Sequence, residues 1–236
     1  MISNALSQQA APYLAFLENW LDTLPSLSLA ELLAAPDEVA IFSVDLTNGF
    51  CVQGPLASPR VAAIVAPVAH LLQAAWEKGV RQILLLQDAH EPNAVEFNQF
   101  PPHCVRGTIE AQAVDELKAL PFYDALLQIP KNSIHSGLNT GLKAWLDAHL
   151  KINTFIVVGD CTDLCVDQLA MYLRLDANAF QIQRRVIVPV NCVDTYDFPV
   201  EAAQAVGGVP HPAELLHAVF LHHLMLNGIE VVARLD

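Results

Sequence analysis

Two cysteines lie four residues apart in GDCTDLCVDQLA, residues 159–170. Such a pair can be a metal clip, a redox pair, a packing detail or a nucleophile with its surroundings. The spacing is not the C-x-x-C of redox sites, and without a further cysteine or histidine pair nearby it does not make a zinc site. Cys165 opens a predicted helix, where free N–H groups, the helix dipole and a cap at Thr162 or Asp163 favour thiolate over thiol. The sequence leaves two readings, a nucleophile or an inert packed cysteine.

Two other reactive side chains end predicted strands. Asp45 ends EVAIFSVD, and Lys131 ends LLQIPK. Taken singly, the aspartate could cap a loop, and the lysine could be a solvated charge. Taken together with Cys165, they could form one catalytic unit, since chance rarely supplies all three. Asp45 would accept the thiol proton, Lys131 would hold the ion pair, and Cys165 would attack a carbonyl carbon.

A second group of polar residues lies in DAHEPNAVEFNQFPPHCVRGT, residues 88–108. Asp88 and His90 point to the same side of a strand end because they alternate, and Glu96 and His103 follow on a loop that can fold back. Two imidazoles with carboxylates suit zinc, manganese or iron(II) and leave room for water or a substrate atom. The alternative is that these histidines belong to an acidic surface loop. Four other histidines are interpreted as structural: His211, His217, His222 and His223.

Short apolar runs alternate with stretches of helical periodicity along the chain. The predicted strands are 38–45, 81–88, 126–131, 154–160, 184–191 and 229–235, and the predicted helices include 59–78, 137–150, 163–176 and 212–227. This alternation predicts a three-layer α/β/α sandwich with a doubly wound, mostly parallel sheet of six strands. Ligands of such sheets bind beyond the carboxyl ends of the strands, where the candidate residues lie.

Composition limits the classes of partner. The net charge is −13 with 12 lysines and arginines, which argues against nucleic acid. Hydrophobic residues make up 53% of the chain, yet no run reaches the roughly 18 residues of a membrane span. Five cysteines and an N-terminus without a signal pattern favour the cytoplasm. Residues 1–36 are expected to form a helical extension for packing or oligomerisation, and residues 37–236 the main domain.

Over residues 38–236 the chain resembles the isochorismatase-like cysteine hydrolases, and within them the nicotinamidases. The resemblance is carried by VDLTNGF, DAHEPN with FPPHCVRGT, PKNS and GDCTDLCV, in that order. It implies that Asp45, Lys131 and Cys165 form a catalytic triad. It also implies one divalent metal at Asp88, His90, Glu96 and His103, with zinc expected and manganese or iron(II) as alternatives.

The resemblance implies further features of the site. A cis peptide would join Asp160 to Cys161, and the N–H groups of Cys161 and Cys165 would form an oxyanion hole. Phe50 and Phe100 would hold the pyridine ring of the substrate. The implied reaction is hydrolysis of nicotinamide to nicotinate and ammonia through a thioester, as in NAD salvage. From its apolar content and N-terminal extension we also expect the chain to form a homo-oligomer.

Some residues depart from the family pattern. Gly49 stands where many nicotinamidases have an acidic residue, and Asp160 stands where a small or apolar residue is usual. Two alternatives therefore remain. One is a hydrolase of another small amide, such as a carbamoyl or ureido compound, and the other is a catalytically silent oligomeric binding module.

Overall fold

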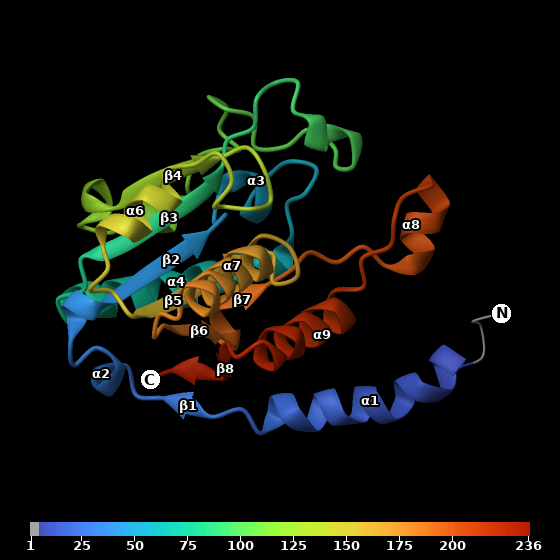
Figure 1. The fold of residues 1–236 in the computed structure, drawn as a ribbon. Helices are drawn as coiled ribbons and strands as arrows, with labels where there is room; N and C mark the ends of the chain where they lie inside the picture. The colour runs from blue at the N-terminus through green and yellow to red at the C-terminus, as the bar shows by residue number, and fades with distance from the viewer. Residues whose placement is uncertain (1–4) are drawn as a thin grey trace.

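The computed structural model describes residues 5–236, which form a parallel β-sheet with helices on both faces (Figure 1). The strands are β1 (Ser26–Leu27), β2 (Val39–Val44), β3 (Gln82–Asp88), β4 (Leu127–Lys131), β5 (Thr154–Asp160), β6 (Arg185–Pro189), β7 (Val193–Asp194), β8 (Glu230–Val232) and β9 (Arg234–Leu235). The helices are α1 (Ala5–Asp22), α2 (Leu29–Leu32), α3 (Asn48–Cys51), α4 (Pro59–Glu77), α5 (Asp115–Lys118), α6 (Leu142–Ala148), α7 (Cys165–Phe180), α8 (Val200–Val206) and α9 (Ala213–Leu226). Short 3-10 turns lie at Pro36–Glu38, Val95–Asn98, Tyr123–Ala125 and Val190–Cys192.

The main sheet has the strand order β4-β3-β2-β5-β6-β8, and all of its pairs are parallel. These are the six predicted strands, so the predicted fold class is confirmed. A seventh strand, β7, pairs with β5 and was not predicted, because two residues are too few for an apolar run to stand out. Helix α6 begins at Leu142 rather than near residue 137, after a loop in which Asn139 has a positive φ of 55°.

Alternate residues of each strand enter two separate cores. On β2, Ile41 packs with α4, whereas its neighbour Phe42 packs with α6 and α7. This alternation explains why the strands are apolar throughout, since side chains that point to either face are buried. The result is a central sheet between two helical layers, as predicted.

The strand order reverses between β2 and β5, and the candidate site residues lie near the carboxyl ends of these strands. The two strands run side by side with Val44 opposite Gly159. A side chain at Gly159 would collide with the Val44 carbonyl oxygen, 1.9 Å from the ideal Cβ position, so only glycine fits there. The close approach of the two strands brings their carboxyl ends, at Asp45 and Asp160, to one edge of the sheet.

The N-terminal extension packs against the C-terminal part of its own chain. Helix α1 lies along α9 (Figure 1), and the Tyr13 hydroxyl is 2.8 Å from Nδ1 of His222. Strand β1 pairs in parallel with β9, a small second sheet that periodicity did not predict. The domain division at residue 36 and the role in oligomerisation stay predictions. None of the described helices combines the length and apolar character that crossing a membrane requires.

Candidate active site

A buried lysine joins the three strands that meet at the carboxyl edge of the sheet. Lys131 ends β4, and its Nζ lies 2.7 Å from Oδ2 of Asp45 and 2.6 Å from Oδ1 of Asp88. The same Nζ lies 3.5 Å from Sγ of Cys165, at the start of α7. All four side chains are buried. The structure therefore brings together Asp45, Lys131 and Cys165, which the sequence had proposed as one unit.

The charges of this group control one another's protonation. The pKa of Asp45 is raised to about 6, because burial and the Asp88 carboxylate raise it by more than Lys131 lowers it. Burial opposes the charge of Lys131 too, but Asp45 and Asp88 outweigh it and hold its pKa well above the usual value. Burial also acts against ionised Asp88, but Lys131, His103 and His90 keep its pKa below the usual range. Lys131 is thus a permanent cation between two carboxyl groups of unequal acidity.

The surroundings of Cys165 differ in two ways from those predicted. Residue 164, not Thr162 or Asp163, is the N-cap of α7, and no side chain caps the helix. Burial raises the pKa of the Cys165 thiol well above its usual value, against the lowering effect of Lys131. Desolvation of the buried sulfur thus acts against the thiolate, in the opposite direction to the helix dipole. A base close to the sulfur would favour its deprotonation, and an Asp45 carboxylate oxygen and Sγ of Cys165 lie within 4.8 Å of one another.

The turn from β5 into α7 presents backbone donors near that sulfur. A cis peptide joins Asp160 to Cys161, as the resemblance implies. Within the described part of the chain, the N–H groups of Cys161 and Cys165 donate no hydrogen bond. Free N–H groups of this kind could donate hydrogen bonds to an oxyanion.

Three residues on the neighbouring strand end and loop could hold a metal ion. Ligand atoms of Asp88, His90 and His103 lie within 4.8 Å of one another, and all three residues are buried. Nε2 of His90 is buried without a hydrogen-bond partner, 3.4 Å from Oδ2 of Asp88. Glu96 lies at the margin of this group, with Oε1 3.8 Å from Nε2 of His90. An orphaned imidazole nitrogen facing a carboxylate fits a divalent cation, since the polar atom would otherwise be unpaired.

Outer contacts orient both imidazoles of this group. Nδ1 of His90 lies 3.1 Å from Oδ1 of Asn132, which also accepts a hydrogen bond from the Glu91 N–H. Nδ1 of His103 lies 2.9 Å from the carbonyl oxygen of Pro101. Both Nδ1 atoms therefore donate, which leaves each Nε2 with a lone pair for a metal. Sequence reasoning missed Asn132, although it lies in the quoted PKNS motif.

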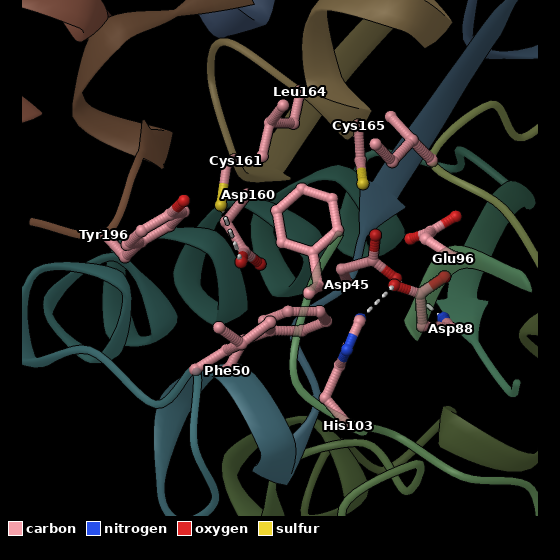
Figure 2. Close-up of a pocket in the computed structure, with 13 residues that line it drawn as sticks. Asp45, Phe50, Asp88, Glu96, His103, Asp160, Cys161, Leu164, Cys165 and Tyr196 are labelled. Carbon is pink, nitrogen blue, oxygen red and sulfur yellow. Dashed lines mark hydrogen bonds and ion pairs between the residues drawn. The ribbon is translucent and has the colours of Figure 1, made fainter. Parts of the chain in front are cut away.

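A pocket opens above these groups and is lined by both predicted aromatic residues, Phe50 and Phe100. Their rings lie beside His103, with centroids at 5.4 and 6.3 Å from its imidazole. Figure 2 shows the carboxylates of Asp45, Asp88 and Glu96 gathered on one side of this pocket with Cys165. The remaining lining residues are Leu56, Ile134, Asp160, Cys161, Leu164 and Tyr196.

Two of the four histidines interpreted as structural contact the turn that leads to Cys165. Nε2 of His211 lies 2.7 Å from Oδ2 of Asp163, and Nδ1 of His217 lies 2.8 Å from the Thr162 hydroxyl. The Thr195 hydroxyl donates to the other oxygen of Asp163 at 2.6 Å. The C-terminal segment thus holds the turn in place. In the sequence, only Thr162 and Asp163 of the GDCTDLCV motif hinted at these contacts. Contacts between residues so far apart along the chain leave no periodic signal.

The two departures from the family pattern have different surroundings. At Gly49, an added Cβ would lie 2.5 Å from Sγ of Cys104, so the thiol occupies the space of a side chain. Asp160 is completely buried and lines the pocket.

Comparison with known proteins places this geometry in a family. The model of the isochorismatase domain matches residues 39–207. Nicotinamidase 1 of Arabidopsis thaliana is 28% identical over 221 residues, which cover 87% of this chain and 89% of that protein. Among solved structures, the pyrazinamidase of Pyrococcus horikoshii in complex with zinc superposes with a TM-score of 0.63 at 23% identity, covering 83% of this chain and 98% of the other. N-carbamoylsarcosine amidase of Thermoplasma acidophilum superposes with a TM-score of 0.61 at 20% identity, covering 83% and 95%.

Fold and site together define a doubly wound α/β hydrolase with a cysteine at the switch point of its sheet. The chain belongs to the isochorismatase family, whose domain model spans most of the main sheet and the turn at Cys165.

Proposed function

We propose that this amide hydrolase converts nicotinamide and water to nicotinate and ammonia through a thioester on Cys165. The observation that carries the proposal is the convergence of Lys131 on Asp45 and Cys165 beside a group fit for a metal. The similarity to Nicotinamidase 1 supports the choice of amide. A carbamoyl or ureido substrate is less well supported, because the relatives that act on these compounds generally lack the metal-binding residues.

The first half of the reaction forms the thioester. Asp45 takes the thiol proton while Sγ of Cys165 attacks the carbonyl carbon of the amide. The oxyanion that develops accepts hydrogen bonds from the N–H groups of Cys161 and Cys165. The C–N bond then breaks, and Asp45 returns the proton to the departing ammonia. Lys131 stays protonated throughout and balances the changing charge of Asp45.

The second half releases the acid. Asp45 takes a proton from a water molecule, whose oxygen attacks the thioester carbon. The C–S bond breaks, and the thiolate of Cys165 takes the proton back from Asp45. Both residues return to their initial protonation states, so the cycle balances.

The proposed metal ligands are Asp88, His90, His103 and Glu96. A divalent ion held there would supply Lewis acidity and a fixed positive charge next to the substrate. Phe50 and Phe100 would hold the ring over the ligand group. Zinc suits the nitrogen and carboxylate donors, although manganese and iron(II) suit them too.

The test is ammonia release by purified protein from nicotinamide, pyrazinamide and small ureido compounds. We expect wild type to act on nicotinamide and Cys165→Ala to lose at least about 10⁴-fold in kcat, the scale seen when a nucleophile is removed. If a ureido compound is hydrolysed and nicotinamide is not, the assignment of the substrate is wrong. If no amide is hydrolysed, the result supports the alternative of a catalytically silent binding module.

Two other cysteines serve as matched controls. Cys161→Ala removes a sulfur but keeps the backbone N–H, so it is expected to lose far less activity than Cys165→Ala. Cys192→Ala changes a buried thiol of the core, away from the pocket. Equal losses in all three variants would point to misfolding rather than to the loss of a nucleophile.

A further inference from the structure

One buried carboxyl group in the pocket takes no part in the proposed mechanism. Asp160 ends β5, is completely buried and lines the pocket. Its Oδ1 has no hydrogen-bond partner among the described residues. Its Oδ2 accepts a hydrogen bond from the thiol of Cys161, at 3.6 Å. A buried polar group left unpaired costs about 1–3 kcal/mol, so this carboxyl needs a partner that the protein itself does not supply.

The Asp160 side chain lies on the other side of the pocket from the candidate metal ligands (Figure 2). Figure 2 shows Asp160 and Tyr196 across the pocket from Glu96 and Asp88. Asp160 belongs to neither of the groups of described residues that could hold a metal. A group on a bound molecule, rather than a second cation, fits as the missing partner.

The carboxyl is suited to a neutral partner. Burial raises the pKa of Asp160 well above its usual value, and the nearby Asp45 carboxylate raises it further. A protonated carboxyl offers one O–H donor and one carbonyl acceptor. A ring hydroxyl group can satisfy both, and a ring amino group can donate to the carbonyl oxygen, whereas a methyl group of the same size can satisfy neither.

We propose that Asp160 is a specificity-determining residue that hydrogen-bonds a second polar group of the substrate, so that the preferred substrates are small aromatic amides with an amino or hydroxyl substituent on the ring. The inference rests on the proposed amide hydrolysis at Cys165. It narrows the class of amide substrates through Asp160, one of the two residues that depart from the family pattern.

The experiment compares kcat/KM for pyridine carboxamides that carry an amino, hydroxyl or methyl group at each free ring carbon. At the ring position that faces Asp160, wild type is expected to prefer the amino over the methyl compound by about tenfold, which corresponds to one buried hydrogen bond. Asp160→Leu keeps the shape but removes the polar atoms, so the preference should disappear. Asp160→Asn keeps one donor and one acceptor, so the preference should survive.

Asp167 provides the matched control, because it is another buried aspartate with an unpartnered oxygen but does not line the pocket. Asp167→Asn should leave the amino-to-methyl ratio as in wild type. A wild-type ratio near one at every ring position overturns the inference, even if Asp160→Leu does not fold. An equal ratio in wild type and Asp160→Leu overturns it too, and a water molecule would then be the partner of Asp160. If wild type hydrolyses no pyridine carboxamide, the proposed function itself fails.

Discussion

Two buried polar clusters flank the turn that carries Cys165, and they differ in what they leave unpaired. The Lys131 cluster consists of Lys131, Asp45 and Asp88, and it lies beside the orphaned Nε2 of His90. The His211 cluster consists of His211, Asp163 and Thr195. In it, both oxygens of Asp163 and both nitrogens of His211 have partners.

The difference indicates which cluster can take part in a reaction and which can only support the backbone. A cluster whose polar atoms face a cavity with open positions can bind a metal or exchange protons with a substrate. A cluster that satisfies all of its polar atoms internally can only fix the backbone around it. We therefore propose that the Lys131 cluster is the reactive one and that the His211 cluster positions the turn.

The largest expected effect on stability comes from removing the shared cation. Lys131→Met leaves the carboxyl groups of Asp45 and Asp88 buried without a counter-charge. We expect the free energy of unfolding to fall by about 3–5 kcal/mol, the scale for breaking a buried ion pair. Denaturant unfolding at neutral pH measures it. A loss below about 1 kcal/mol would mean that these charges are solvated and that the cluster is not as the structure has it.

Zinc affinity should fall more when a metal ligand is removed than when the residue that orients this ligand is removed. His90→Ala removes the orphaned nitrogen and should weaken zinc binding by more than about 100-fold. Asn132→Ala only removes the partner that orients the His90 ring, so it should lower the affinity for zinc by about 10–100-fold. Titration calorimetry of chelator-treated protein with zinc measures both affinities. Stoichiometric zinc in purified His90→Ala would refute the ligand set.

The His211 cluster should affect stability in a pH-dependent way. Burial lowers the pKa of His211, but the hydrogen bond and charge of Asp163 outweigh burial and raise this pKa above 6.5. Burial raises the pKa of Asp163, but His211 and Thr195 outweigh burial and lower this pKa below 3.8. The raised histidine contributes fully below pH 6.5 and loses its contribution as pH rises through its folded value. The lowered aspartate contributes fully above pH 3.8 and loses its contribution as pH falls through its folded value. The pair is therefore most stabilising between pH 3.8 and 6.5.

His211→Phe tests this expectation while keeping a ring against Tyr196. We expect a loss of about 2 kcal/mol near pH 5.5, the scale of hydrogen bonds to charged groups, and a smaller loss at pH 8.5. Chemical unfolding of both proteins at the two pH values gives the comparison. A difference that stays constant between them would show that the imidazole does not carry a charge in this cluster.

The smallest effect is expected at an exposed pair. Arg185 and Glu230 form an ion pair with N···O at 2.7 Å, but both side chains are at least two-fifths exposed. Arg185→Met should change the free energy of unfolding by no more than about 1 kcal/mol, and high salt should reduce even that. A larger loss would show that charge pairing alone, without burial, explains the effect at Lys131.

The sequence predicted the Lys131 cluster better than the His211 cluster, for a physical reason. Asp45, Asp88 and Lys131 each end an apolar run, so the parallel sheet alone brings them to one edge. His211 and Asp163 meet through tertiary packing of a long connection, which no periodicity records. The sequence favoured the thiolate of Cys165 because of its place at a helix start, whereas burial raises the pKa of this thiol, and the extent of burial is not visible in a motif. The β1–β9 pair was missed since two-residue strands carry no pattern.

The central claim is that Cys165, and not Cys161, attacks the carbonyl carbon. The most direct test is a crystal structure of the wild-type protein with pyridine-3-carbaldehyde, whose aldehyde carbon can add a thiol. We predict a covalent bond from that carbon to Sγ of Cys165, with the oxygen facing the N–H groups of Cys161 and Cys165. A bond to Cys161, or an aldehyde bound away from the Lys131 cluster, would contradict the account.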